Sequence, residues 1–156
     1  MMKSQALSAE RAFALDYATE IERIAGKLRH ALTHELNRRG LVVAISGGID
    51  SSVSAALAVR AVGPKRVYGL LLPERVSSPQ STHRGRLLAE HLGIEYEIFD
   101  IAPALEALGC YARVDEVCKA VHAGYGAGWK NKIVLEGGLE GRYNHFKLVA
   151  QDPAGK

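Results

Sequence analysis

The chain has 156 residues, an apolar content of 47%, a charged content of 24% and a formal net charge of +3. These values are ordinary for a folded globular protein, and the length suits one compact domain rather than two. The small net charge gives no support for a nucleic-acid partner. No apolar run approaches the roughly 20 residues that a membrane-spanning helix needs, and the first residues lack the apolar stretch of a signal peptide. We therefore expect a cytoplasmic protein without membrane or nucleic-acid partners.

The first predicted element is a long amphipathic helix over residues 8–39. Its apolar residues recur at spacings of three and four, which places them on one stripe of a helix. Ser8 can cap this helix, and Gly40 is expected to stop it. The stripe suits either packing within the chain or a two-fold interface between two copies.

Three short apolar runs follow and alternate with helical segments. We expect strands over residues 41–45, 66–73 and 94–101, and helices over residues 51–62 and 79–92. The first two strands are expected to be buried, with apolar side chains of the first on both faces of the sheet. This alternation is typical of crossovers that build a parallel sheet with helices on both faces. The predicted fold class is therefore α/β, a Rossmann-like doubly wound parallel sheet.

The pattern is weaker after Ile101. Two short helices are expected over residues 103–108 and 113–121, and two strands joined by a glycine-rich turn follow over residues 132–150. This last pattern predicts a terminal β-hairpin. We expect residues 1–156 to form a single domain.

The stretch SGGIDSS, residues 46–52, joins the first predicted strand to the next helix. Gly47 and Gly48 can adopt backbone angles that aim successive N–H groups at a phosphate, and the start of the helix adds a partial positive charge. The serines at positions 46, 51 and 52 supply hydroxyl donors, although each also suits a plain helix cap. The sequence therefore predicts a phosphate-binding loop.

Asp50 indicates which kind of phosphate ligand suits this loop. A carboxylate repels a bare polyphosphate but bridges to one through Mg²⁺, so we expect a metal–triphosphate complex. The loop contains neither the G-x-G-x-x-G pattern nor the Gly-Lys-Ser/Thr ending of a Walker loop, and another nucleotide-binding class is required. Arg75, Ser77 and Ser78 follow the second strand at the same edge, where a polar contact to ATP and a plain loop are equally open.

The string SGGIDSS resembles the PP-loop of the ATP pyrophosphatases, an adenine-nucleotide α-hydrolase-like group that splits ATP between its α- and β-phosphates. Two further stretches, VYGLLLPERVSSPQST and LLAEHLGIEYEIFDIAPALEAL, make the chain similar to the first half of the NAD⁺ synthetases. The resemblance covers residues 21–108.

This resemblance implies a set of ATP-binding residues. The backbone near Leu72 would recognise adenine, and Asp50 would bind Mg²⁺. The residues that would hold the phosphates are Ile45, Ser46, Gly47, Gly48, Ile49, Asp50, Ser51 and Ser52. No single catalytic residue is identified, because catalysis in this family rests mainly on positioning and charge neutralisation.

The resemblance also implies a ligase of NAD biosynthesis. The carboxylate of deamido-NAD (nicotinic acid adenine dinucleotide) would attack the α-phosphate of ATP with release of pyrophosphate. Ammonia would then displace AMP and give NAD⁺. NAD⁺ synthetases are typically dimers, so the resemblance implies a homodimer.

Members of this family continue beyond the matched region with a TGN(K/R)xE-type segment that carries a second metal-binding carboxylate, and these 156 residues contain no such segment. We therefore expect an ATP-binding PP-loop domain that is incomplete at its C-terminal end. Two alternatives stay open. One is another PP-loop ATP pyrophosphatase, either GMP synthetase-like or tRNA-thiolating. The other is a non-catalytic ATP-binding module.

Overall fold

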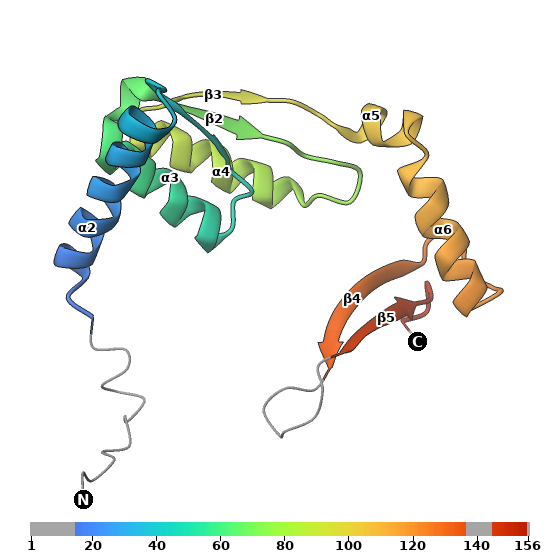
Figure 1. Ribbon diagram of the computed structural model, residues 1–156. Helices are drawn as coiled ribbons and strands as arrows, with labels where there is room; N and C mark the ends of the chain where they lie inside the picture. The colour runs from blue at the N-terminus through green and yellow to red at the C-terminus, as the bar shows by residue number, and fades with distance from the viewer. Residues whose placement is uncertain (1–14, 137–144, 156) are drawn as a thin grey trace, which may run out of the picture. The chain divides into compact units, whose positions relative to one another are not determined.

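The computed structural model describes residues 15–136 and 145–155 of the chain. It divides into two compact units, Met1–Ile101 and Ala102–Lys156. The first unit contains a three-stranded parallel sheet with helices, and the second contains two helices and an antiparallel hairpin (Figure 1). The predicted α/β class, with a parallel sheet and a terminal hairpin, is therefore confirmed.

The elements of the first unit are α2 (Tyr17–His30), the π-helical turn η1 (Ala31–Glu35), β1 (Leu41–Ala44), α3 (Ile49–Val62), the short 3₁₀ helix η2 (Pro64–Arg66), β2 (Val67–Leu71), α4 (Pro79–Leu92) and β3 (Glu95–Ile98). The elements of the second unit are α5 (Ala102–Ala107), α6 (Cys110–Val121), β4 (Lys130–Glu136) and β5 (His145–Gln151). No helix in residues 15–136 or 145–155 is long and apolar enough to cross a membrane.

Helix α2 begins at Tyr17, inside the predicted range 8–39, because Asp16 caps it. The Asp16 carboxylate accepts hydrogen bonds from the amides of Ala18 and Thr19, at 3.2 and 3.3 Å. The Thr19 hydroxyl also donates to this carboxylate at 2.5 Å, and these bonds lower the pKa of the Asp16 carboxyl. The charged carboxylate satisfies N–H groups that a helix start leaves without partners. The cap predicted at Ser8 lies outside the described residues.

The helix also ends earlier than predicted. After His30 the α-helix widens into the π-helical turn η1, and the chain reaches a positive φ of 51° at Asn37. A non-glycine residue in this left-handed region ends a right-handed helix, and asparagine tolerates it better than most residues. The helix therefore stops before Gly40, the predicted end.

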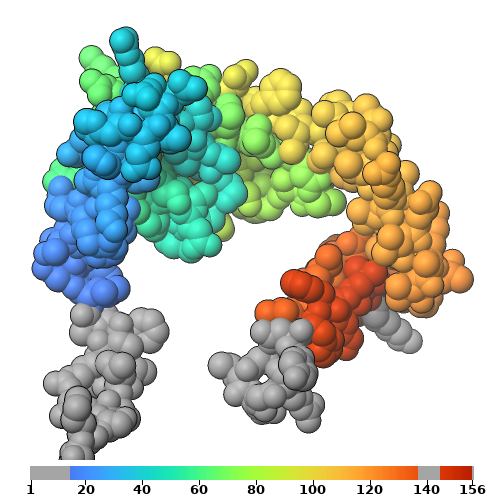
Figure 2. Space-filling model, viewed as in Figure 1, coloured from blue at the N-terminus to red at the C-terminus, as the bar shows by residue number. Residues whose placement is uncertain are grey.

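The apolar stripe of α2 packs mainly on α3. Ala25 and Leu32 are buried, and Arg29 Nε donates to the carbonyl oxygen of Ala61 at the end of α3, at 2.8 Å. Figure 2 shows α2 lying directly against α3. This contact leaves Tyr17 70% exposed at the start of the helix.

The parallel sheet has the strand order β1-β2-β3, and α3 and α4 cover the same face of it. Small side chains bring the helices close, because Ala55, Ala58 and Ala89 are buried and Gly85 of α4 packs against Leu71. The core between this face and the two helices consists of Ile45, Ala55, Ala58, Val67, Leu71, Ala89 and Ile94.

The prediction that the first strand has apolar side chains buried on both faces is wrong for the structure as described. Val42 is 66% exposed and Ala44 is also exposed, whereas Val43 and Ile45 face the core. The physical reason is that α3 and α4 lie on one face only. The strand also ends at Ala44, although the Ile45 amide still donates to the Leu70 carbonyl oxygen at 2.8 Å.

The helix after the loop begins two residues before its predicted start, because Gly48 occupies the N-cap position. Its predicted end at Val62 is confirmed, and Gly63 follows with a φ of 83°. The predicted bounds of α4 are also confirmed. Ser78 caps α4 by accepting a hydrogen bond from the Gln80 amide at 3.2 Å.

The second unit is held by an aromatic cluster between α6 and the hairpin. Tyr125 is buried, its ring lies 5.6 Å from that of Trp129, and its hydroxyl accepts a hydrogen bond from Asn131 Nδ2 at 2.6 Å. Trp129 also contacts the ring of His122 at 4.8 Å. Trp129 therefore anchors the loop that leads into β4.

We predict that Leu71→Ala destabilises the first unit strongly. Leu71 is only 1% exposed and lies between the sheet and Gly85 of α4. Truncating a buried leucine to alanine costs about 2–5 kcal/mol, because it leaves a cavity. Urea unfolding measures this free energy. The matched control, Leu87→Ala on the 51% exposed Leu87 of α4, should cost less than about 1 kcal/mol. Equal losses would contradict this account of the core.

Candidate functional site

The predicted phosphate-binding loop lies at the carboxyl end of β1. Residues 45–48 connect β1 to the first turn of α3, and the ends of β1 and β2 are adjacent because these strands pair in parallel. Ligands of open parallel sheets bind in the crevice at this edge. The fold therefore places SGGIDSS where a nucleotide site is expected.

A network of serine hydroxyls holds the loop. Ser51 Oγ donates to the Gly48 carbonyl oxygen at 3.0 Å and accepts from the Ser46 amide at 3.2 Å. The two hydroxyls of Ser46 and Ser51 are 3.0 Å apart, and Ser46 Oγ accepts from the Gly48 amide at 3.3 Å. Ser52 Oγ also donates to the Gly48 carbonyl oxygen, at 2.8 Å. In the structure, the three predicted serines therefore order the loop itself.

The start of α3 has no side-chain cap. The alternative that one of these serines merely caps the helix is therefore not what the structure shows. The first N–H groups of a helix have no carbonyl partner within the helix and carry its partial positive charge. Because Gly48 is the N-cap, the amides that follow it are suited to an anion. Ile49 and Asp50 are exposed at this end.

Gly47 is the residue that brings the loop against α4. Its φ is +78°, and a Cβ built at this position would lie 2.2 Å from the Ser81 carbonyl oxygen. Any side chain would therefore require both a strained backbone and a displaced helix. Gly48 differs, because its φ is −90° and a Cβ there would meet Ser46 Oγ at 3.4 Å. Sequence reasoning treated the two glycines alike, and the structure gives only Gly47 a strict steric requirement.

A pocket of about 150 Å³ adjoins the loop. It is lined by Ile45, Ser46, Leu71, Leu72, Pro73, Ser77, Ser81 and Thr82. Three of the predicted nucleotide-binding positions, Ile45, Ser46 and Leu72, are thus brought together. Its volume is below the about 300–1,000 Å³ of pockets for drug-sized ligands, so it suits one ring of a nucleotide rather than a whole one.

The structure also identifies two pocket residues that sequence reasoning missed. Ser81 and Thr82 belong to the first turn of α4, directly after the loop that follows β2. The available signal was the clustering of hydroxyl side chains in SSPQST, residues 77–82. Ser77 lines the pocket and accepts a hydrogen bond from the Glu74 amide at 3.0 Å, whereas Ser78 is used as the helix cap.

The backbone of Leu72 is directed toward the end of β1. The carbonyl oxygens of Leu71 and Pro73 accept from Phe99 and Ile101 on the β3 side, at 2.9 and 3.0 Å. Residues of an extended strand present their N–H and C=O groups alternately to the two sides. The polar groups of Leu72 consequently point to the β1 side, where the loop and the pocket lie.

Asp50 is the carboxylate of this site. Ser54 Oγ donates to the main-chain carbonyl oxygen of Asp50 at 2.9 Å, which leaves the carboxylate out of that bond. In the part of the chain that the structure describes, no three His, Cys, Asp or Glu residues come together as a metal site. Mg²⁺ commonly binds through one or two carboxylates and the phosphates of its nucleotide. The single Asp50 carboxylate therefore fits a Mg²⁺ ion whose other ligands include the phosphates of a nucleotide.

We predict that Gly47→Ala destabilises the protein without any ligand present. The backbone strain and the contact with the Ser81 carbonyl should together lower the free energy of unfolding by about 1–3 kcal/mol or more. The matched control, Gly48→Ala, should stay within about 1 kcal/mol of the native protein. Thermal and urea unfolding measure both. If the two variants unfold alike, the close approach of the loop to α4 is not a constraint.

Comparison with known proteins adds an independent line of evidence. The sequence model of the NAD synthase family matches residues 20–124, which is more than half of the chain. The chain is 52% identical over 143 residues to the NH(3)-dependent NAD(+) synthetase of Rhizobium meliloti (strain 1021), and this match covers 91% of the chain and 42% of the relative. It is 49% identical over 144 residues to the protein of the same name from Mesorhizobium japonicum, covering 92% of the chain and 45% of the relative.

A solved structure agrees with these matches. The NH3-dependent NAD synthetase from Campylobacter jejuni, in complex with the nitrate ion, superposes with a TM-score of 0.56 at 28% identity, over 63% of this chain and 42% of that chain. The chain thus spans less than half the length of these relatives. With the family match, the sequence identity and the loop geometry in agreement, this chain belongs to the NAD synthase family.

Proposed function

We propose that this chain provides the ATP-binding part of an ammonia-dependent NAD⁺ synthase. The observation that carries the proposal is the ordered loop at the end of β1, with an uncapped helix start on one side and a ring-sized pocket beside the Leu72 backbone on the other. The names of the relatives support this reaction over a GMP synthetase-like or tRNA-thiolating one. Within residues 1–156, the first unit would make the nucleotide contacts.

The residues have separate roles in this proposal. The amides at the start of α3, those of residues 49–51, bind the phosphates of ATP, and the Asp50 carboxylate binds Mg²⁺. The backbone of Leu72 hydrogen bonds to the adenine ring in the pocket that Ile45 and Thr82 also line. Mg²⁺, when bound, neutralises phosphate charge.

The reaction then needs few chemical groups from the protein. A carboxylate oxygen of deamido-NAD forms a bond to the α-phosphorus of ATP, and the bond to the β-phosphate breaks with release of pyrophosphate. Ammonia adds to the activated carbonyl carbon, the added nitrogen loses one proton to give the amide, and AMP leaves with the electron pair of the C–O bond. The loop holds the α-phosphate in place for in-line attack, and its N–H groups stabilise the developing charge. We assign no covalent role to any residue of the chain.

The proposal also includes a cytoplasmic location and a homodimeric assembly. Cys110 and Cys118 are free thiols, which suits the reducing cytoplasm.

The exposed Tyr17 at the start of α2 supports a homodimer that uses this helix. Sedimentation equilibrium should give a dimer mass for the native chain and a monomer mass for Tyr17→Glu. A native chain that stays monomeric at every concentration would contradict the homodimer.

We predict that Asp50→Asn removes the Mg²⁺ dependence of ATP binding. Asparagine has the same shape but no charge, so the fold should persist while the affinity for Mg²⁺·ATP falls about tenfold or more, to the level that the native chain shows with EDTA. Isothermal titration with and without Mg²⁺ measures this affinity. Glu116→Gln, the same kind of change at an exposed position of α6, serves as the control and should bind like the native chain.

Pyrophosphate release identifies the acceptor. The proposal expects release from ATP only when deamido-NAD and Mg²⁺ are present, with repeated turnover only when ammonia is added, and no release from Asp50→Asn. Release with a guanine-nucleotide precursor or with tRNA would assign the chain to another PP-loop enzyme. ATP binding without release for any acceptor would show that the chain acts as a binding module.

A further inference from the structure

Two histidines lie side by side where helix α2 passes into the π-helical turn η1. The ring centroids of His30 and His34 are 4.8 Å apart, and the ring planes are tilted by 36° to each other. Residues four apart are neighbours on a helix surface, so the contact is made within one continuous helical segment. The separation of the two rings is therefore set locally.

The π-helical turn brings the two residues closer along the helix axis. The Leu36 amide donates to the carbonyl oxygen of Ala31 at 2.9 Å, five residues earlier, which is the hydrogen bond of a π turn. Such a turn contains more residues than an α-helical turn, so the rise per residue is smaller. Single π turns are rare in helices and are found frequently at functional sites. The turn is thus a reason to ask what the histidine pair binds.

The spacing of the rings suits a shared metal ion. A metal–nitrogen bond to histidine is about 2.0–2.1 Å long, which puts the ring centroid about 3.2 Å from the ion. Two imidazoles that bind one ion at the angles of tetrahedral or octahedral sites then have centroids about 4.5–5.2 Å apart. The observed 4.8 Å between His30 and His34 lies within this range.

The turn before the pair has room for an ion and its water ligands. Gly26 precedes His30 by four residues, and a Cβ built at Gly26 would meet no atom within 4 Å. Helical side chains lean toward the N-terminus of their helix, so His30 lies over the turn that contains Gly26. The missing side chain at Gly26 leaves space beside the His30 ring.

The donor atoms select the class of metal. Magnesium and calcium prefer oxygen ligands, whereas imidazole nitrogens suit Zn²⁺, Cu²⁺ and Ni²⁺. Lys27 lies three residues before His30 on the same side of α2, so charge alone would not attract a cation. In residues 15–136 and 145–155, no third His, Cys, Asp or Glu completes a metal site. The pair is therefore a two-nitrogen chelate whose other positions are open to water.

The pair lies at the end of the first unit opposite to the phosphate loop. Arg29 is the neighbour of His30, and its Nε donates to the carbonyl oxygen of Ala61 near the end of α3. The phosphate loop precedes the start of the same helix. An ion on the histidine pair would therefore not compete with the Mg²⁺ that accompanies the nucleotide.

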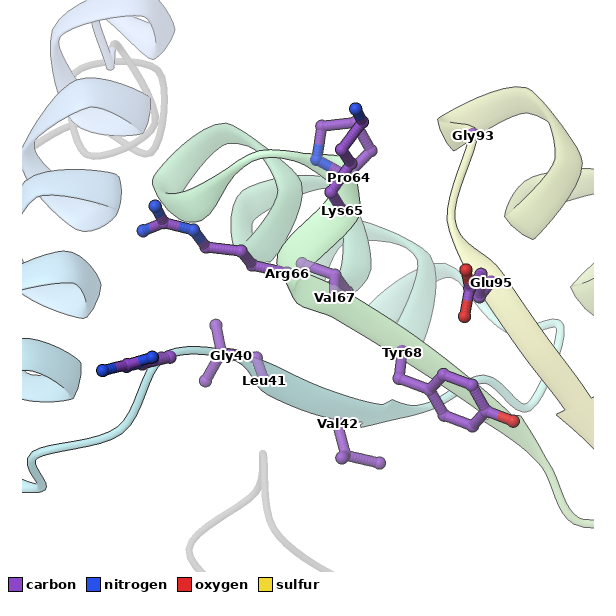
Figure 3. A pocket seen from close by; sticks show the side chains of 11 residues that line it. Gly40, Leu41, Val42, Pro64, Lys65, Arg66, Val67, Tyr68, Gly93 and Glu95 are labelled. Atoms are coloured by element: carbon purple, nitrogen blue, oxygen red, sulfur yellow. The ribbon is translucent and has the colours of Figure 1, made fainter.

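A hollow of about 610 Å³ also lies at the amino ends of the strands, but its charge does not suit a cation. Figure 3 shows Arg66 and Glu95 on opposite sides of it. Arg39 and Lys65 line it as well, so three cations face one carboxylate. The two imidazoles are better metal ligands than the groups of this hollow.

We propose that His30 and His34 bind one divalent transition-metal ion of the Zn²⁺ class, at a site separate from the nucleotide site. The ion bonds to one nitrogen of each ring, and water occupies its remaining positions. By joining the end of α2 to η1, it stabilises the widened turn at the end of this helix. The inference does not rest on the proposed function.

Calorimetric titration of the whole chain with Zn²⁺, in excess Mg²⁺, tests the site. We expect His30→Gln and His34→Gln each to bind Zn²⁺ about tenfold or more weakly than the native chain, because each variant keeps one ligand of two. Glutamine is a good helix former, so the helix should persist. His91→Gln, at an exposed histidine of α4, is the matched control and should bind like the native chain. Native affinity in both of the first two variants would overturn the proposal.

A second measurement uses the native chain and so does not depend on the folding of a variant. In an NMR titration with Zn²⁺, the ring signals of His30 and His34 should shift together, and those of His83 and His91 should stay in place. Zn²⁺ should also raise the midpoint of thermal unfolding, because an ion that binds the folded chain stabilises it. Unshifted His30 and His34 signals would contradict the site even if Zn²⁺ binds elsewhere.

The metal site and the proposed function fail in distinguishable ways. Asp50→Asn should bind Zn²⁺ like the native chain, and His34→Gln should keep the native affinity for Mg²⁺·ATP. Loss of ATP binding with intact Zn²⁺ binding contradicts the proposed function alone. Intact ATP binding in a chain whose histidine pair takes no Zn²⁺ contradicts this inference alone.

Discussion

The close approach of Gly47 to the Ser81 carbonyl of α4 is the contact on which the arrangement of the site depends. It fixes the end of β1 against the first turn of α4, and so it sets the distance between the phosphate loop and the pocket. Small residues also allow close packing deeper in the fold, where Gly85 and Ala89 let α4 lie close to the sheet. The position of α4 thus links core packing to the geometry of the proposed nucleotide site, and the hydroxyl side chains of its first turn become pocket residues as a result.

Much of the site could be predicted from the sequence because its determinants are local. A β-strand, two glycines and a helix start in direct succession restrict the chain to a few conformations, and residues 46–52 form such a loop at the edge of the sheet. The predicted bounds of α4 are confirmed for a similarly local reason, because Ser78 caps the helix and Gly93 ends it in the left-handed region. Ser81 and Thr82 could not be found in this way, because their part in the pocket depends on the packing of α4 against the loop.

The prediction for residues 41–45 was wrong for an instructive reason. The composition of a strand reports how much burial the folded protein requires, but it does not say which element provides the cover. Val42 has the side chain of a two-sided core strand and is nevertheless exposed beside Tyr68. The start of α2 at Tyr17 was missed because a stripe of apolar residues does not show that the Asp16 carboxylate accepts from the amides of Ala18 and Thr19.

The main-chain geometry at Leu72 has a consequence for how freely this position can vary. Pro73 restricts the residue before it to extended angles, so Leu72 continues the line of β2 whatever its side chain is. A base that hydrogen bonds to the main-chain N–H and C=O groups of residue 72 does not depend on the side chain there, so most other residues would bind it equally well. Only proline would delete the donor. Under the proposed function, other side chains at position 72 are therefore compatible with unchanged base recognition, and variation there among relatives is no sign that the nucleotide has changed.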